Sequence, residues 1–493
     1  MSKAGTFAVA MFLALTNCTR SRAQNPCSTV NNNLICVIPQ VFSPTGGVNL
    51  PNQAHRAHFD SDFQENATAL TSVTAAVGSE LTALRLASPA SGVIFAFDRN
   101  LAVVKRSTES YGPILGERAE TIGRHRFFVA ATYQFFPFSS LDGIDLKHLP
   151  AVYRHGDTVN PDGTHRNPAV DPHSPGNPGM ELEYIITTNR IDLKVHQFTF
   201  YATYGLTNRI DISAAVPILD VRLGISSVAT IVRTPDPIVQ PIPASDYVTA
   251  PDSLLGRLYR GTGPAADCYL TLSCSGYFHY FDPNNPATSL THTFSNAKTA
   301  SGIGDVIFRL KGTVFQSERA AAALGVNLRA PSGDEKNFLG SGAAGVEPFV
   351  AVSYRARISP HVDIGYEFNG SSILVGNILK GTKGHLPDQL LYSAGADAGV
   401  TRKLTVAVDL LGERLYGAPG VAQGAFFDVL GASHPDVLQI TPTHRSFSMN
   451  DLAVGAKYDL HGNLLLTGNV QFKLDDGGLR AKVVPLVGVS YTF

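Results

Sequence analysis

The sequence has no tryptophan and few cysteines or charges. Its 493 residues include five Cys and four Met, and charged residues make up 16% of the chain, below the usual quarter of a globular protein. Without Trp, aromatic girdles at a membrane surface would have to consist of the 17 Tyr and 27 Phe. The formal net charge of -1 provides no overall basic surface, so we expect no nucleic-acid partner.

The chain also lacks the hydropathy of a helical membrane protein. Its mean hydropathy is only +0.04, and an apolar run near the start, residues 7–15, is too short to span a bilayer. This run follows Lys3 and precedes Ser21-Arg22-Ala23, which is the order of a secretory signal peptide. We therefore expect residues 1–23 to be a signal peptide. A lipoprotein signal at Cys18 is the alternative, which Asn17 disfavours because a small residue is expected there.

Catalytic and metal-binding motifs are missing as well. The sequence contains neither a G-x-S-x-G nucleophile elbow nor a P-loop, and the cysteine spacings are not those of a zinc site. We therefore expect no cofactor, no metal ion and no enzymatic activity. An outer-membrane hydrolase stays an alternative because catalytic groups assemble from distant strands; His361, His434 and His444 would be its candidates.

Four cysteines would remain after removal of residues 1–23. They form two pairs close in sequence, Cys27 with Cys36 and Cys268 with Cys274. Because an exported protein meets an oxidising compartment, we expect two local disulfides. Free thiols are the alternative.

What the sequence does have is alternation, seen most clearly in its last fourteen residues, 480–493. Apolar residues share one parity: Ala481, Val483, Pro485, Val487, Val489, Tyr491 and Phe493. The other parity carries Lys482, Gly488, Ser490 and Thr492, with Val484 and Leu486 as exceptions. Such a two-faced strand is typical of a transmembrane β-barrel, because in lipid only helices and closed barrels satisfy every backbone polar group.

The same pattern recurs along the chain, and it predicts about twelve membrane strands. They are residues 124–135, 190–204, 209–232, 301–315, 319–330, 345–358, 361–373, 389–400, 403–415, 447–460, 463–474 and 480–493. We expect a bulge near His196, where the parity of apolar residues changes, and a bent, extended hairpin beyond Val221, where it changes again.

The connections between these strands alternate between short turns and long loops. Short turns are expected at residues 205–208, 316–318, 359–360, 401–402 and 461–462. Long loops are expected at residues 137–188, 233–300, 331–344, 374–388 and 416–446. An even strand number puts every long loop on one side, as in a single-chain outer-membrane barrel with periplasmic termini. A β-sandwich or propeller is the alternative, but neither requires this alternation.

Residues 24–123 do not follow the barrel pattern. Residues 65–86 form a weak helix at best, and residues 93–97 and 101–105 could form a small hairpin whose arms are shorter than membrane strands. We interpret the segment as a periplasmic extension or a plug in the barrel mouth. If the hairpin spans the membrane, the barrel has 14 strands. The domain organisation is thus a signal peptide (1–23), a periplasmic or plug segment (24–123) and the barrel (124–493).

Nearly all charges in the predicted strands fall on the inward parity. A basic side chain facing lipid at the bilayer midplane would cost about 2–4 kcal/mol. The expected lumen-lining residues are Asp305, Arg309, Lys311, Arg329, Glu347, Arg355, Asp363, Glu367, Asp397, Lys457, Lys473 and Lys482. Such charges either line a polar pore or lock the lumen with ion pairs.

Two short stretches resemble a known outer-membrane family. They are YGLTNRIDISAAVP at Tyr204–Pro217 and GIGDVIFRL at Gly302–Leu310. They are similar to the family named for the MetA-pathway of phenol degradation, whose members are described as transporter-like barrels, and the resemblance covers roughly residues 190–493. It implies passage of small, aromatic or otherwise apolar molecules.

The sequence therefore predicts a porin-like transporter of the bacterial outer membrane that takes up small molecules passively. Its partners would be outer-membrane lipid, a small-molecule solute and the barrel assembly machinery, which would contact the C-terminal strand ending at Phe493. The alternatives are the outer-membrane hydrolase and a surface structural or adhesion barrel that relies on its long loops.

Overall fold

The computed structural model describes residues 27, 33–43, 47–51, 59, 64–82, 84–88, 95–98, 103–106, 110–154, 183–232, 247–249, 257–259, 279–285, 288–378, 380–427 and 433–493. The expected signal peptide and the pair Cys268 and Cys274 lie outside these residues.

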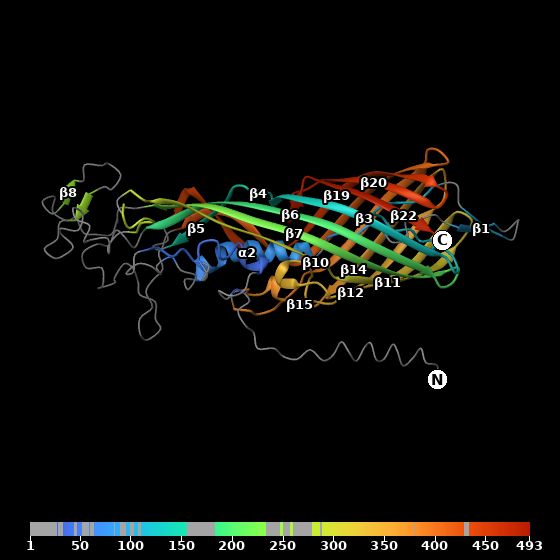
Figure 1. The fold of residues 1–493 in the computed structure, drawn as a ribbon, viewed down its shortest axis with the longest axis horizontal. Coiled ribbons are helices and arrows are strands. Elements are labelled where there is room, and N and C mark those ends of the chain that lie inside the picture. Colours follow the sequence, from blue (N-terminus) through green and yellow to red (C-terminus); the bar gives the residue numbers. More distant parts are fainter. Residues whose placement is uncertain are drawn as a thin grey trace, which may run out of the picture.

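Twelve antiparallel strands close into a single barrel (Figure 1). They are β3 (Phe127–Leu141), β6 (Tyr184–Gly205), β7 (Ile210–Val232), β11 (Val306–Gln316), β12 (Ala320–Ala330), β13 (Gly345–Tyr354), β14 (Ile358–Asn369), β17 (Asp388–Gly399), β18 (Leu404–Phe427), β19 (Ser433–His461), β20 (Leu464–Lys473) and β22 (Val483–Thr492). Each strand pairs with the next along the chain, and β22 pairs with β3 to close the barrel. The predicted twelve-stranded barrel is confirmed. The possible strands 13 and 14 are instead β1 (Phe95–Asp98) and β2 (Val103–Arg106), which form a separate two-stranded sheet.

The two ends of the barrel differ in their connections. Short turns at residues 206–209, 317–319, 355–357, 400–403 and 462–463 lie at one end, called here the turn end. The C-terminal strand finishes there, where the backbone N–H of Phe493 donates to the carbonyl oxygen of Phe127 at 2.8 Å. The longer connections lie at the opposite, loop end. The predicted alternation of short and long connections is confirmed except between β18 and β19, which only residues 428–432 separate.

The outer wall near the turn end is apolar. Large side chains at alternate positions point outward, among them Leu324, Leu466 and Val487, which are about half exposed at 52%, 48% and 55%. Exposed apolar surface of this kind along the wall is what a lipid-facing barrel presents. None of the described helices is long and apolar enough to cross a membrane.

The bulge that we expected near His196 is absent from β6. The pairing of β6 with β7 runs without a register shift from Tyr184 opposite Val232 to Gly205 opposite Asp211. Odd-numbered residues of β6 point inward over the whole length, including apolar Leu193 and polar Thr199. What changes near His196 is the surroundings, not the register. Toward the turn end the outer face is apolar, and toward the loop end the inner face is apolar because it packs on protein.

The same inversion explains the second expected switch, at Val221. On β7, exposed Ile218 is the last of the regularly spaced apolar residues on the outer face, and Asp220 and Arg222 follow it on that face. Val221 and Leu223 are buried on the inner face. The apolar part of the outer wall, called here the apolar belt, therefore ends between Ile218 and Asp220 on this hairpin.

Several loops that we expected to be irregular are extended strands. The stretch 416–446 is largely the continuation of β18 and β19, and part of 233–300 is β10 (Thr291–Ile303), which pairs with the upper half of β7. The chain breaks at Gly304 and Asp305 and resumes as β11 on the lower half of β7. These segments lack lipid-type alternation because both of their faces lie outside the apolar belt.

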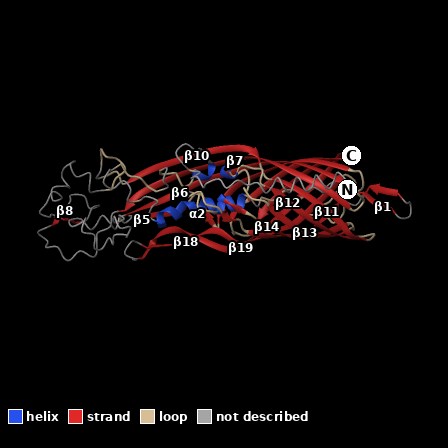
Figure 2. Ribbon diagram, turned by 90° about the horizontal axis from the view of Figure 1, so that it is seen from below, coloured by secondary structure: helices blue, strands red, loops and turns tan. Residues whose placement is uncertain are grey.

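The loop end is capped by the N-terminal part of the chain. Helix α2 (Gln64–Leu81) packs against β5 (Leu149–Arg154), β18 and β19, enclosed by strands (Figure 2). The 3₁₀ helix η1 (Leu34–Cys36) joins the same apolar core, and Cys36 forms a disulfide with Cys27. Burial in this core accounts for a helix that the sequence pattern indicated only weakly, because packing contributes more to helix stability than propensity does.

The remaining short elements lie in the connections. They are β4 (Ile144–Asp145), β8 (Tyr247–Thr249), β9 (Arg257–Tyr259), β15 (Ser371–Ser372), β16 (Gly384–His385), β21 (Leu479–Ala481), η6 (Glu335–Asn337) and η7 (Ile373–Val375).

Candidate functional site: the filled lumen of the barrel

Two stretches of the N-terminal segment lie inside the barrel. Residues 84–88 and 110–123, called here the inner segments, hydrogen-bond to inward-facing groups of β7, β11, β13, β14, β17, β18 and β19. They also hold each other, since the hydroxyl of Ser88 donates to Glu117 at 2.7 Å. The barrel therefore encloses a polar interior occupied by its own chain.

Lys311 on β11 anchors the second inner segment. Its ammonium donates to the carboxylate of Glu117 at 2.8 Å and to the carbonyl oxygens of Arg118 and Glu120 at 3.0 and 2.9 Å. All three of its N–H groups are thereby used, and the side chain is 1% exposed. Arg309, two residues earlier on the same face, bonds the other carboxylate oxygen of Glu117.

Lys457 on β19 provides a second anchor on the opposite wall. Its ammonium donates to the carbonyl oxygens of Tyr111 and Pro113 at 3.2 and 2.5 Å. The hydroxyl of Tyr111 donates to the carboxylate of Asp459 at 3.0 Å. Two buried lysines therefore hold main-chain carbonyls of the inner segment, a contact that does not depend on the side chains of that segment.

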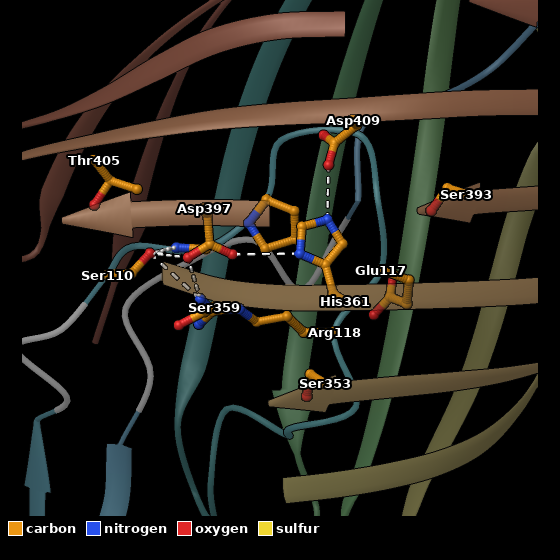
Figure 3. A network of polar contacts seen from close by, with 12 residues as sticks. Ser110, Glu117, Arg118, Ser353, Ser359, His361, Ser393, Asp397, Thr405 and Asp409 are labelled. Atoms are coloured by element: carbon orange, nitrogen blue, oxygen red, sulfur yellow. Dashed lines mark hydrogen bonds and ion pairs between the residues drawn. The ribbon is translucent and has the colours of Figure 1, made fainter. Parts of the chain in front are cut away.

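A network around Asp397 links the inner segment to β14, β17 and β18 (Figure 3). Asp397 accepts from Arg118 at 2.7 Å and from Ser110, and it lies 3.5 Å from Nδ1 of His361. The other ring nitrogen of His361 lies 2.7 Å from the carboxylate of Asp409. The ring is clamped between two carboxylates.

This clamp does not have the arrangement of a catalytic triad. Both nitrogens of His361 face carboxylates, so neither is placed to take a proton from a serine. The hydroxyl of Ser393, drawn nearby in Figure 3, donates instead to Asp363. The other two candidates lie apart: His434 packs on Phe426, and His444 is exposed on β19. Among the described residues, no cluster of His, Cys, Asp and Glu is arranged to hold a metal ion.

Glycines give the inner segment room beside the wall. A Cβ atom on Gly116 would lie 2.9 Å from Nε2 of His361. A Cβ atom on Gly205 would lie 1.8 Å from the carbonyl oxygen of Gly123, where the inner segment leaves the lumen. Gly205 therefore serves close approach of this segment as well as the turn that follows it.

Two cavities remain beside residues 84–88. One has a volume of about 150 Å³ and is lined by residues of β6, β7, β11, β12, β13, β14 and β17. The other, of about 70 Å³, is lined by residues of β3, β18, β19, β20, β21 and β22. Leu84 and Arg85 line both. The guanidinium of Arg85 donates to the carbonyl oxygens of Gly412 and, at 3.4 Å, Tyr392.

Near the loop end, Glu80 of α2 is buried beside the smaller cavity. Its carboxylate accepts from the backbone N–H of Leu479. Burial raises the pKa of Glu80 well above its usual range; the hydrogen bond from Leu479 opposes this shift, and the nearby carboxylates of Asp142 and Glu413 add to it. The neutral acid is thus the form that the docked helix favours.

The twelve residues that we expected to line the lumen take part in several different ion pairs and hydrogen bonds, and one of them is exposed. Arg309 and Lys311 meet at Glu117, Arg329 lies between Asp305 and Glu367, and Glu347 accepts from Asn327. Asp363, Asp397 and Lys457 bond the second inner segment, as does Arg355 through Glu120. Lys473 pairs with Asp476 at the loop end, and Lys482 is exposed there.

The sequence analysis did not identify the residues of the inner segments that bond the barrel wall. Arg85, Glu117, Arg118 and Glu120 lie outside any strand pattern, so parity could not place them. One signal was available: the run 116–120, GERAE, puts three charges directly before the first membrane strand.

Comparison with known proteins finds likeness at the level of the barrel. No protein-family model and no curated protein matches the chain. An outer membrane channel from Pseudomonas putida F1 is 11% identical, with a TM-score of 0.39, covering 76% of this chain and 98% of that one.

Two further solved structures resemble the chain to a lower degree. A FadL homologue from Pseudomonas aeruginosa is 10% identical, with a TM-score of 0.27, covering 75% of this chain and 90% of that one. The toluene transporter from Ralstonia pickettii is 9% identical, with a TM-score of 0.24 and the same two coverages. At these values the likeness adds nothing about cargo or mechanism.

Proposed function

We propose that the protein is a passive channel of the bacterial outer membrane that admits small solutes. The observation that carries this proposal is a closed twelve-stranded barrel with apolar side chains outside and charged side chains inside. The apolar wall suits lipid, and a charged lumen suits polar or charged solutes crossing that wall. Short turns in such barrels face the periplasm, so the turn end would face the periplasm and the loop end the outside.

In this proposal the inner segments are a plug. Leu84 and Arg85 of the first inner segment lie between the two cavities, and ion pairs and hydrogen bonds tie the second inner segment to the wall on opposite sides. Solutes could pass only after these contacts break. The channel would therefore be closed most of the time and would open when the inner segments shift.

The chemistry of the lumen favours polar cargo. Carboxylate, guanidinium and amide groups line the larger cavity. The family resemblance points instead to aromatic or apolar molecules. An uptake assay should therefore include both polar solutes and aromatic or apolar solutes. We also propose Phe493, a residue that is 60% exposed at the turn end, as a contact for the barrel assembly machinery.

The test is conductance and solute uptake with the purified full-length protein. In planar bilayers we expect discrete openings separated by long closures, and in liposomes slow uptake of small solutes. Protein-free membranes are the control. Absence of openings at all voltages together with absence of uptake would overturn the proposal, and it is the result that a purely structural or adhesive barrel would give.

A further inference from the structure

Arg85 lies among carboxylates that come from four different strands. They are Glu347 of β13, Asp363 of β14, Glu413 of β18 and Asp451 of β19, each of which lines a cavity together with Arg85. These four residues are called here the acidic ring. Glu347 and Asp363 line the larger cavity, and Glu413 and Asp451 line the smaller one. Arg85 lines both cavities, so its side chain stands between the two halves of the ring.

The ring has few other cations of its own. Asp451 accepts from Arg480 at 2.6 Å, whereas Glu347 accepts from the neutral amide of Asn327 at 2.6 Å. Asp363 accepts from the neutral hydroxyl of Ser393 and from the backbone N–H of Glu117 at 3.1 Å. Without Arg85, the positive charge left near Glu347 would be that of Arg309, which lines the same cavity, and the positive charge left near Glu413 would be that of Arg480.

Glu413 gives independent evidence that the acidic ring binds a ligand with hydrogen-bond donors. The residue is only 4% exposed, and it lines the smaller cavity. Its Oε1 has no hydrogen-bond partner among the residues that the structure describes. Because leaving a buried acceptor unpaired is costly, a carboxylate held this way beside a cavity is suited to a ligand that brings N–H groups.

We propose that the acidic ring is the cargo-binding site of the channel, that its cargo is a small organic cation with a guanidinium or primary ammonium group, and that Arg85 takes the place of this cargo when the lumen is closed. This inference rests on the proposed function. A ring of carboxylates selects cations in a pore, and the guanidinium of Arg85 shows that a planar group with several N–H donors fits between the walls.

The binding test uses the full-length Arg85→Ala protein with methylguanidinium as probe. The vacated ring should bind the probe, so millimolar methylguanidinium should raise the thermal midpoint of R85A and leave wild type nearly unchanged, because Arg85 fills the site there. Arg190→Ala is the matched control, since it removes an arginine exposed on the outer wall. Adding Glu413→Gln to R85A should lower the affinity for the probe by about 10- to 100-fold. A probe effect on R85A no larger than on R190A would overturn the inference.

Selectivity measurements on the wild-type background cover the case in which R85A does not fold. In a potassium chloride gradient, the reversal potential of wild-type openings should show cation preference. Glu413→Gln and Asp363→Asn should each reduce that preference. Openings that are unselective or prefer anions would refute the cationic cargo while leaving the channel intact. Absence of openings in every variant would instead refute the proposed function, whatever the binding test shows.

Discussion

Replacing Lys311 by methionine should release the inner segments from the barrel wall. The substitution keeps the length and apolar stem of the side chain but removes its ammonium, which makes three hydrogen bonds to Glu117, Arg118 and Glu120. The site is buried, with Lys311 1% exposed. The oxygens of the inner segment would therefore lose their donors in a place that water does not readily reach.

The expected size of the effect follows from this burial. Removing one partner of a buried ion pair costs about 3–5 kcal/mol. This cost falls on the closed state alone, because in the open state the side chain at position 311 and the released oxygens would be solvated. Each ~1.4 kcal/mol changes an equilibrium tenfold, so the ratio of open to closed channels should rise roughly 100-fold or more.

Single-channel recording in planar bilayers measures that ratio directly. Lys403→Met is the matched control, because Lys403 is exposed in a short turn and should leave the open probability unchanged. Circular dichroism would establish that both variants keep their β-structure. A folded K311M protein with the open probability of wild type would refute the idea that these contacts close the lumen.

Three further substitutions probe other parts of the account. Leu410→Lys places a charge on the apolar outer wall and should destabilise the barrel by about 2–4 kcal/mol, measured by denaturant titration in lipid. Its control is Val228→Lys, which lies beyond the apolar belt and should change stability by less than about 0.5 kcal/mol. Equal effects of the two substitutions would contradict the proposed end of the apolar belt. Because its folded pKa is raised, Glu80 contributes fully to the docking of α2 below about pH 4.5, its unperturbed value, and that contribution is lost as the pH rises. Glu80→Gln should therefore flatten the pH dependence of hydrogen exchange in α2 above about pH 4.5, and an unchanged pH profile would argue against a neutral buried acid. Gly205→Ala should cost about 1–3 kcal/mol through overpacking, while Gly424→Ala, whose added Cβ atom meets nothing within 4 Å, serves as control.

The barrel was predictable because lipid imposes a local rule on each strand. Alternation at positions such as Val487 and Val489 needs no knowledge of any other part of the chain, and both point outward. The rule fails where the strands leave the apolar belt. At His196 and Val221 the sequence pattern changes parity while the register does not, because the inner face there packs on protein and the outer face does not meet lipid.

The filling of the lumen could not be read from local patterns. Lys311 and Glu117 are separated by 194 residues, and Lys457 and Tyr111 by 346. Inward parity told us that Lys311 needs a polar environment, but it could not say whether solvent or the chain itself supplies it. The same holds for Arg85, whose significance depends on carboxylates brought together only by closure of the barrel.

The most direct measurement is conductance of a channel whose inner segment is tied to the wall. Ala119 of the inner segment packs with Ala321 and Ala323 of β12. Cysteines at Ala119 and Ala323, bridged by a disulfide or a short thiol reagent, should abolish openings and uptake, and reduction should restore both. Each single cysteine variant and the wild type, with and without reductant, are the controls. Openings that persist at the wild-type frequency in the bridged protein would show that solutes do not need the inner segment to move, and would contradict the account.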